Sequence, residues 1–139
     1  RVFFTGSAQE ARLVEEILDK MSCDGVSLAG KTGLMASAAV IGALDLFITN
    51  DSAPLHIASA LKTPTVAIFG PSKSNETGPY GNAHRVVEKD FPCRGACDED
   101  VCRHTPYNEC MASIGVDDVF NAAVDLLATT GRRGDGFKA

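Results

Sequence analysis

Short apolar runs alternate with helix-like stretches along the first half of the chain. The apolar runs predict strands at residues 2–4, 26–28, 46–49 and 66–69. Between them, helical spacing or an Ala-rich apolar composition predicts helices at residues 11–21, 34–43 and 55–61. We expect the helix at 34–43 to be buried. Such alternation implies an α/β fold with a mostly parallel sheet and helices on both faces.

The pattern changes after residue 70. Residues 71–84 contain two Pro, two Gly and two Asn, which predicts a loop. Residues 85–88 predict a last strand, and residues 116–128 predict a closing helix. Its expected apolar stripe consists of Val116, Val119, Phe120, Ala123, Val124 and Leu127. Residues 129–139 have no periodicity, and we expect a disordered tail there.

Size and composition narrow the possible classes of protein. A chain of 139 residues predicts one domain, at residues 1–128 before the tail. The net charge of −5 gives no electrostatic footprint for nucleic acid or anionic lipid. No apolar stretch approaches the roughly 20 residues that span a bilayer. The chain begins at Arg1 and is already strand-like at residues 2–4, so we expect a piece of a longer protein.

The clearest chemical signal lies where the third and fourth predicted strands end. Asp51, Ser52 and Ala53 follow the third strand and open a helix near Pro54, and a loop at residues 70–73 follows the fourth. Ligands bind at the carboxyl ends of strands in open α/β sheets, and helix N-termini attract anions there. The small Ala53 lets an anion approach the backbone. The pattern therefore predicts a phosphate-bearing ligand.

Each of these residues also has an ordinary structural interpretation. Asp51 and Ser52 are favoured helix caps, and His56 is expected either to pack against the sheet or to donate a hydrogen bond to phosphate or sugar. Glu10 stands three residues after Ser7, which is the spacing of a capping box, although a carboxylate can also accept two ribose hydroxyls.

Lys31 and Thr32 follow the second predicted strand. They either contact phosphate or the edge of a base, or they start the next helix.

The five cysteines leave three possibilities open. Cys23 stands alone, whereas Cys93, Cys97, Cys102 and Cys110 are separated by three, four and seven residues, with His104 among them. This spacing lacks the paired Cys-x-x-Cys of a strong zinc signal. Packed free thiols, a disulfide and a structural metal site all remain possible. An odd count favours a reducing compartment.

Two segments of the chain resemble glycosyltransferase family 9, the ADP-heptose:lipopolysaccharide heptosyltransferases. They are residues 49–61 (TNDSAPLHIASAL) and 66–72 (VAIFGPS). The family pattern there is Asp-Ser/Thr-Gly/Ala-x-x-His followed by a strand that ends in Phe-Gly-Pro-Ser/Thr. The similarity extends to residues 6–10, 28–32 and 78–81 and covers roughly residues 2–128.

The resemblance implies a GT-B architecture, in which two Rossmann-like domains enclose the active site. Residues 1–128 would form most of the C-terminal, nucleotide-sugar-binding domain, without its first β-α unit and without the N-terminal domain. Asp51, Ser52 and Ala53 would lie at the donor diphosphate, with His56 close to it. Glu10 would hold the ribose hydroxyls, and Thr32, next to Lys31, would border the adenine.

The resemblance also implies an activity. We expect inverting transfer of heptose, or a related sugar, from an ADP-sugar to a glycolipid of the lipopolysaccharide inner core, with no cofactor besides the donor. In the family the catalytic Asp lies in the N-terminal domain, so we expect no catalytic residue in this chain and no activity from it alone. The full enzyme is expected to be cytoplasmic and peripheral at the inner membrane. The alternatives are a non-catalytic nucleotide-binding module and an interaction domain with a metal at the cysteines.

Overall fold

A computed structural model of the chain describes residues 1–94, 96–97 and 101–131. The chain divides into two compact units, Arg1–Val40 and Ile41–Ala139. Every strand pairing within the described ranges is parallel, as the alternating pattern predicts. The strands form a two-stranded and a three-stranded sheet. The alternating pattern predicts the direction in which the strands pair, but it does not predict which strands are neighbours.

The first unit is built around two short parallel strands. Its elements are β1 (Val2–Phe4), the 3₁₀ helix η1 (Ala8–Glu10), α1 (Ala11–Leu18), β2 (Gly25–Ser27) and the start of α2 (Leu34–Ala43). Phe3 pairs with Val26 in the centre of the ladder, and Val14 is the buried residue of α1. In α2 only Ile41 is buried, and Leu34 and Met35 are largely exposed. The expectation of a buried α2 is therefore wrong, since an Ala-rich helix is apolar on every side and does not indicate which face is covered.

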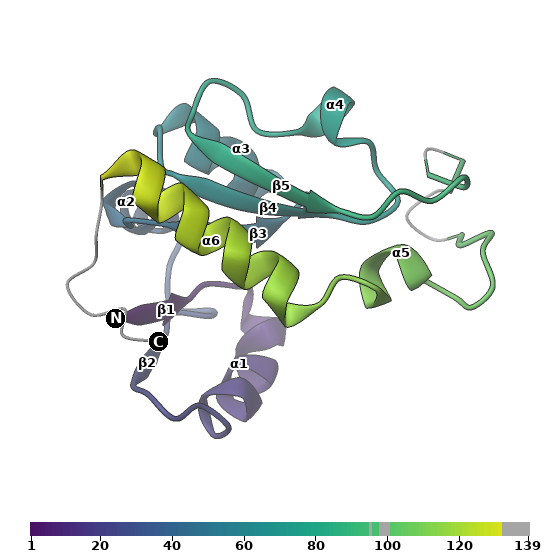
Figure 1. Ribbon diagram of the computed structural model, residues 1–139. Helices are drawn as coiled ribbons and strands as arrows, with labels where there is room; N and C mark the ends of the chain where they lie inside the picture. The colour runs from purple at the N-terminus through teal and green to yellow at the C-terminus, as the bar shows by residue number, and fades with distance from the viewer. Residues whose placement is uncertain (95, 98–100, 132–139) are drawn as a thin grey trace. The chain divides into compact units, whose positions relative to one another are not determined.

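The second unit is a three-stranded parallel sheet with the strand order β3-β4-β5. Its elements are the end of α2, β3 (Phe47–Asn50), α3 (Ala53–Ala60), β4 (Thr65–Phe69), α4 (Ser74–Thr77), β5 (His84–Glu88), α5 (Glu109–Ala112) and α6 (Val116–Thr130). Figure 1 shows α6 lying across one side of β4 and β5, with α3 on the other side.

The core of this unit follows from the two-residue period of β4. Val66 points to one face and packs with Leu126 of α6, and its neighbour Ala67 points to the other and packs with Leu55 of α3. All four of these residues are completely buried. Because both faces of the sheet are covered, the sequence of β4 is a continuous apolar run without alternating polar residues. The predicted helices on both faces are confirmed.

Two further predictions need correction. The stretch 71–84 holds the four-residue helix α4, which is too short to leave a periodic signal. The buried face of α6 is formed by Val119, Ala122, Ala123 and Leu126, whereas Val116, Phe120 and Val124 of the predicted stripe are exposed.

The predicted tail at 129–139 overlaps the end of α6, which runs to Thr130. Residues 132–139 lie outside the described part of the chain.

Candidate functional site

The loops that follow β3 and β4 leave the sheet at the same edge. Asn50, the last residue of β3, is paired with Ile68, and β4 ends one residue later at Phe69. Because the strands are parallel, the loops at residues 51–52 and 70–73 both extend beyond their carboxyl ends. The structure therefore brings together, in the second unit, the segment that carries Asp51, Ser52, Ala53 and His56 and the loop after β4.

Helix α3 begins beyond β3 without a side-chain cap. Ser52 occupies the N-cap position in an extended conformation, but no side chain makes a capping hydrogen bond to the first turn. The Ser52 hydroxyl instead donates to the carbonyl of Asn50 at 3.2 Å. Ala53 is exposed, and Pro54 stands in the first turn, where its missing N–H costs nothing. The prediction that the Asp51 and Ser52 side chains cap this helix is wrong.

Asp51 is held by a residue from the other loop. Its Oδ2 accepts a hydrogen bond of 3.1 Å from the Thr77 hydroxyl in α4. Since α4 follows the loop after β4, this bond links the segments beyond the two strands. Thr77 was not identified from the sequence, because α4 itself leaves no pattern there.

His56 lies on the exposed side of α3. Its neighbour Leu55 is completely buried, whereas His56 is exposed. The interpretation of His56 as a residue packed against the sheet is therefore wrong, and its ring is accessible to a ligand near the first turn of the helix.

The loop after β4 is fixed by Arg94. The guanidinium donates to the carbonyl of Gly70 at 3.1 Å and to that of Ser72 at 2.8 Å, and it forms an ion pair of 2.5 Å with Glu88. The hydrogen bond and charge of Arg94 hold the pKa of Glu88 below its usual value. The Arg94 side chain is only 12% exposed. Sequence reasoning missed this residue, because it stands within the cysteine-rich segment and no spacing marks it.

Gly70 is a second constraint on the same loop. A Cβ at this position would lie 2.6 Å from Sδ of Met111, so a larger residue requires the methionine to move. The loop also borders an open hollow of about 380 Å³ whose lining includes Lys73, Ser74 and Glu88.

In the first unit, Glu10 has the structural role that its spacing predicts. Its Oε2 accepts hydrogen bonds from the backbone N–H of Ser7 at 2.6 Å and from the Ser7 hydroxyl at 2.8 Å. The bond from the backbone, and then the bond from the hydroxyl, lower the pKa of Glu10. Both bonds engage Oε2, so a hydrogen bond from a ligand to Oε1 would not compete with them.

Lys31 and Thr32 stand beyond β2, at the same sheet edge as Glu10. The Lys31 ammonium donates to the carbonyl of Ser27 at 3.1 Å, and the Thr32 hydroxyl lies 2.8 Å from that of Ser37 in α2. The N–H of Gly30 donates to the carbonyl of Gly6 at 2.9 Å and joins the loops after β2 and β1. The structure thus groups these predicted residues within the first unit.

The cysteines are free thiols in the structure, and Cys23 is exposed. The other four and His104 line one cavity, described below. No group of three or more His, Cys, Asp or Glu side chains in residues 1–94, 96–97 and 101–131 is arranged to hold a metal ion. Of the helices in these ranges, none has the length and apolar character needed to cross a membrane.

The comparisons with known proteins agree on one family. The profile of glycosyltransferase family 9 (heptosyltransferase) matches residues 1–108. Lipooligosaccharide heptosyltransferase 2 of Campylobacter jejuni is 33% identical over 129 residues, which are 91% of this chain and 40% of that protein. Lipopolysaccharide heptosyltransferase 2 of Escherichia coli is 35% identical over 91 residues, 63% of this chain and 26% of that protein. This chain thus spans about two fifths or less of the curated relatives it matches.

Two solved structures share the fold. The ADP-heptose lps heptosyltransferase II of E. coli superposes with a TM-score of 0.75 at 27% identity, over 94% of this chain and 37% of that one. The glycosyl transferase family 9 protein of Veillonella parvula gives a TM-score of 0.81 at 28% identity, over 91% and 36%. They confirm the predicted Rossmann-like fold of the GT-B type. The chain belongs to glycosyltransferase family 9, the heptosyltransferase family.

Proposed function

We propose that this chain is the donor-binding part of an inverting glycosyltransferase that moves heptose, or a related sugar, from an ADP-sugar to a lipopolysaccharide inner-core acceptor. The names of the matched relatives support heptose transfer. The chain's span of about two fifths of such a relative supports its assignment to one domain of a two-domain enzyme. In this proposal residues 1–128 are the C-terminal domain.

The observation that carries the proposal is the uncapped start of α3. This turn stands beyond the carboxyl end of β3, next to the exposed Ser52 hydroxyl. Pro54 has no N–H and the N–H of Leu55 donates to the Ser52 carbonyl at 2.9 Å, so the amide of the small Ala53 and the helix dipole face an anion there. Backbone N–H groups and the positive end of a helix dipole stabilise a diphosphate without a cationic side chain. His56 is exposed one turn on and would donate a further hydrogen bond.

Asp51 would act through the loops, because its carboxylate repels phosphate at short range. Its bond from Thr77 joins the segment after β3 to α4, which would keep the start of α3 in place for the phosphate. For the nucleoside, we predict that Glu10 accepts hydrogen bonds from the ribose hydroxyls. Thr32, with Lys31, is predicted to contact the adenine or phosphate.

The chemistry requires stabilisation of charge on the leaving group. As the bond from sugar to diphosphate breaks, negative charge grows on the ADP, and donors already aimed at that position lower the barrier. A carboxylate of the other domain would deprotonate the acceptor hydroxyl. We place the whole enzyme in the cytoplasm, peripheral at the inner face of the inner membrane, where a glycolipid acceptor is accessible.

ADP titration by calorimetry tests the donor site. The wild-type chain should bind ADP, and Ser52→Ala combined with His56→Ala should weaken binding by about 100-fold or more, since hydrogen bonds to a charged group contribute about 1.5–3 kcal/mol each. Both side chains are exposed, so the urea midpoint should not change. A wild-type chain that ignores ADP would contradict the proposal.

Turnover needs the second domain. Fused to the N-terminal domain of a family member, the chain should release ADP from ADP-heptose only when an inner-core acceptor is present. The chain by itself should bind ADP and release none. Binding without turnover in the fusion would favour the non-catalytic nucleotide-binding module.

A further inference from the structure

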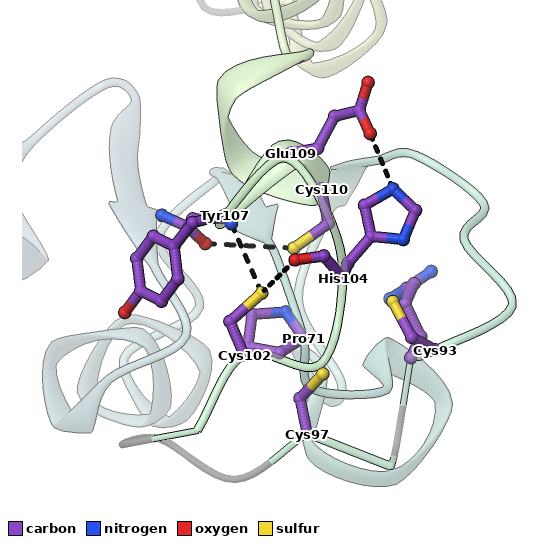
Figure 2. Close-up of a pocket in the computed structure, with 10 residues that line it drawn as sticks. Pro71, Cys93, Cys97, Cys102, His104, Tyr107, Glu109 and Cys110 are labelled. Atoms are coloured by element: carbon purple, nitrogen blue, oxygen red, sulfur yellow. Dashed lines mark hydrogen bonds and ion pairs between the residues drawn. The ribbon is translucent and has the colours of Figure 1, made fainter.

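A small cavity in the second unit is lined mostly by sulfur-bearing and polar side chains. Its volume is about 40 Å³, and its lining includes Cys93, Cys97, Cys102, Cys110, His104, Tyr107 and Glu109. Figure 2 shows Cys93, Cys97 and Cys102 among the residues that line this cavity. Cys93, Cys97 and Cys102 are half-buried, so small reagents can reach them, whereas Cys110 is buried.

The half-buried thiols of Cys93 and Cys102 have different surroundings. The backbone N–H of Asn108 donates to Sγ of Cys102 at 3.2 Å. This bond is the main cause of the lowered pKa of Cys102. Burial and the neighbouring Cys97 raise the pKa of Cys93. The pKa of Cys102 is thus lower than that of Cys93, and Cys97 lines the same cavity as both.

We propose that Cys97 and Cys102 form a thiol–disulfide exchange site that reacts with low-molecular-weight disulfides. None of the residues assigned to the donor nucleotide lines this cavity, although Pro71 of the loop after β4 does.

The reaction has two balanced steps. The Cys102 thiolate attacks one sulfur of a disulfide RS–SR, which forms a mixed disulfide Cys102–S–SR and expels RS⁻. Cys97 then loses its proton, and its thiolate attacks Sγ of Cys102 and expels the second RS⁻. The two thiols of the protein are oxidised to one disulfide, and RS–SR is reduced to two RSH, which take up the two protons.

The short sequence separation favours a reversible bond. A disulfide needs its two sulfurs to approach to about 2.05 Å, and Cys97 and Cys102 already line the same small cavity. Closing so short a loop removes little entropy from the unfolded chain, so the bond stabilises the fold less than a long-range disulfide would. A reductant therefore reverses it readily.

Mass spectrometry of the chain after brief treatment with oxidised glutathione tests the site. Trypsin cuts after Arg94 and Arg103, so both cysteines fall in the peptide 95–103, and Cys93 falls in the preceding peptide. We expect the peptide 95–103 to lose the mass of two hydrogens, and to do so about tenfold faster than the exposed Cys23 acquires glutathione.

Three variants separate the roles of the thiols. Cys97→Ser should leave a stable glutathione adduct on the peptide 95–103, because the second step has no attacking thiol. Cys102→Ser should abolish the fast phase. Cys93→Ser is the matched control and should react like the wild type. Far-UV circular dichroism of each variant reports whether it is folded before treatment.

Several results would overturn the proposal. One is oxidation of the peptide 95–103 no faster than modification of Cys23. Another is a product in which Cys93 and Cys97 link two tryptic peptides. A third is one zinc ion per purified chain that protects these thiols until a chelator removes it.

Discussion

Replacement of Arg94 by Ala should destabilise the second unit far more than replacement of an ordinary surface arginine. The side chain ties two carbonyls of the loop after β4 and the Glu88 carboxylate into one network. Arg94→Ala removes all three bonds at once and leaves Glu88 without its ion pair.

The size of the expected loss in stability follows from how deeply the ion pair of Arg94 and Glu88 is buried. Exposed ion pairs contribute about 0–1 kcal/mol, whereas breaking a buried pair costs about 3–5 kcal/mol. The Arg94 and Glu88 side chains are 12% and 31% exposed, which places this pair between the two cases. Water can partly solvate the Glu88 carboxylate after it loses its partner. We therefore expect Arg94→Ala to lower the free energy of unfolding by about 2–3 kcal/mol.

Urea denaturation measures this loss, and Arg85→Ala is the matched control. Arg85 forms an ion pair of 2.6 Å with Asp125, but these side chains are 39% and 58% exposed, so its removal should cost less than about 1 kcal/mol. At a urea slope of about 1–3 kcal/mol per molar, Arg94→Ala shifts the midpoint by about 1 M or more. Equal effects of the two variants would refute the reasoning from burial.

The loss should also depend on pH. Arg94 lowers the pKa of Glu88 in the folded protein, so the ion pair stabilises the fold above the unfolded pKa of about 4.3. This contribution disappears as the pH falls through the folded pKa of Glu88. The difference between wild type and Arg94→Ala should therefore shrink below about pH 4, where only the bonds to the carbonyls remain.

Three further predictions concern packing, backbone conformation and charge. Leu126→Ala, at a completely buried position, should lower the free energy of unfolding by about 2–5 kcal/mol in urea titrations. Gly30 has φ of +68° and no space for a Cβ, so Gly30→Ala should lower the melting temperature through a strain of about 1–2 kcal/mol, whereas Gly33→Ala, in open space, should not. Lys89 is the main cause of the lowered pKa of Asp118, so Lys89→Ala should raise that pKa in an NMR titration.

The sheet of the second unit was largely predictable because burial on both faces gives its central strand an unbroken apolar run. Residues 65–69 are recognisable as a strand for this reason. The helices that flank them are recognisable from their own spacing of apolar residues. The buried face of α6 was not predictable in detail, because apolar residues such as Val116 and Val124 also occupy its exposed side. Periodicity identifies a helix more reliably than it identifies the face that packs.

The candidate site was also predictable only in part. Asp51, Ser52 and Ala53 were found because small polar residues at a strand end are a local signal. Thr77 and Arg94, which hold the two loops, act through contacts across 26 and up to 24 positions of sequence. Such contacts depend on the tertiary fold, and no spacing within one chain reveals them.

Ala53→Asp tests most directly whether the first turn of α3 binds the diphosphate. A carboxylate at the first position of a helix stabilises it by about 0.3–1 kcal/mol through the helix dipole, so the variant should be at least as stable as the wild type. The same charge about 5 Å from a phosphate costs about 3 kcal/mol at an effective dielectric of 20. Calorimetry should therefore show ADP binding weakened by about 100-fold, with Ala53→Gly unchanged. Equal ADP affinities of wild type and a folded Ala53→Asp would contradict the claim.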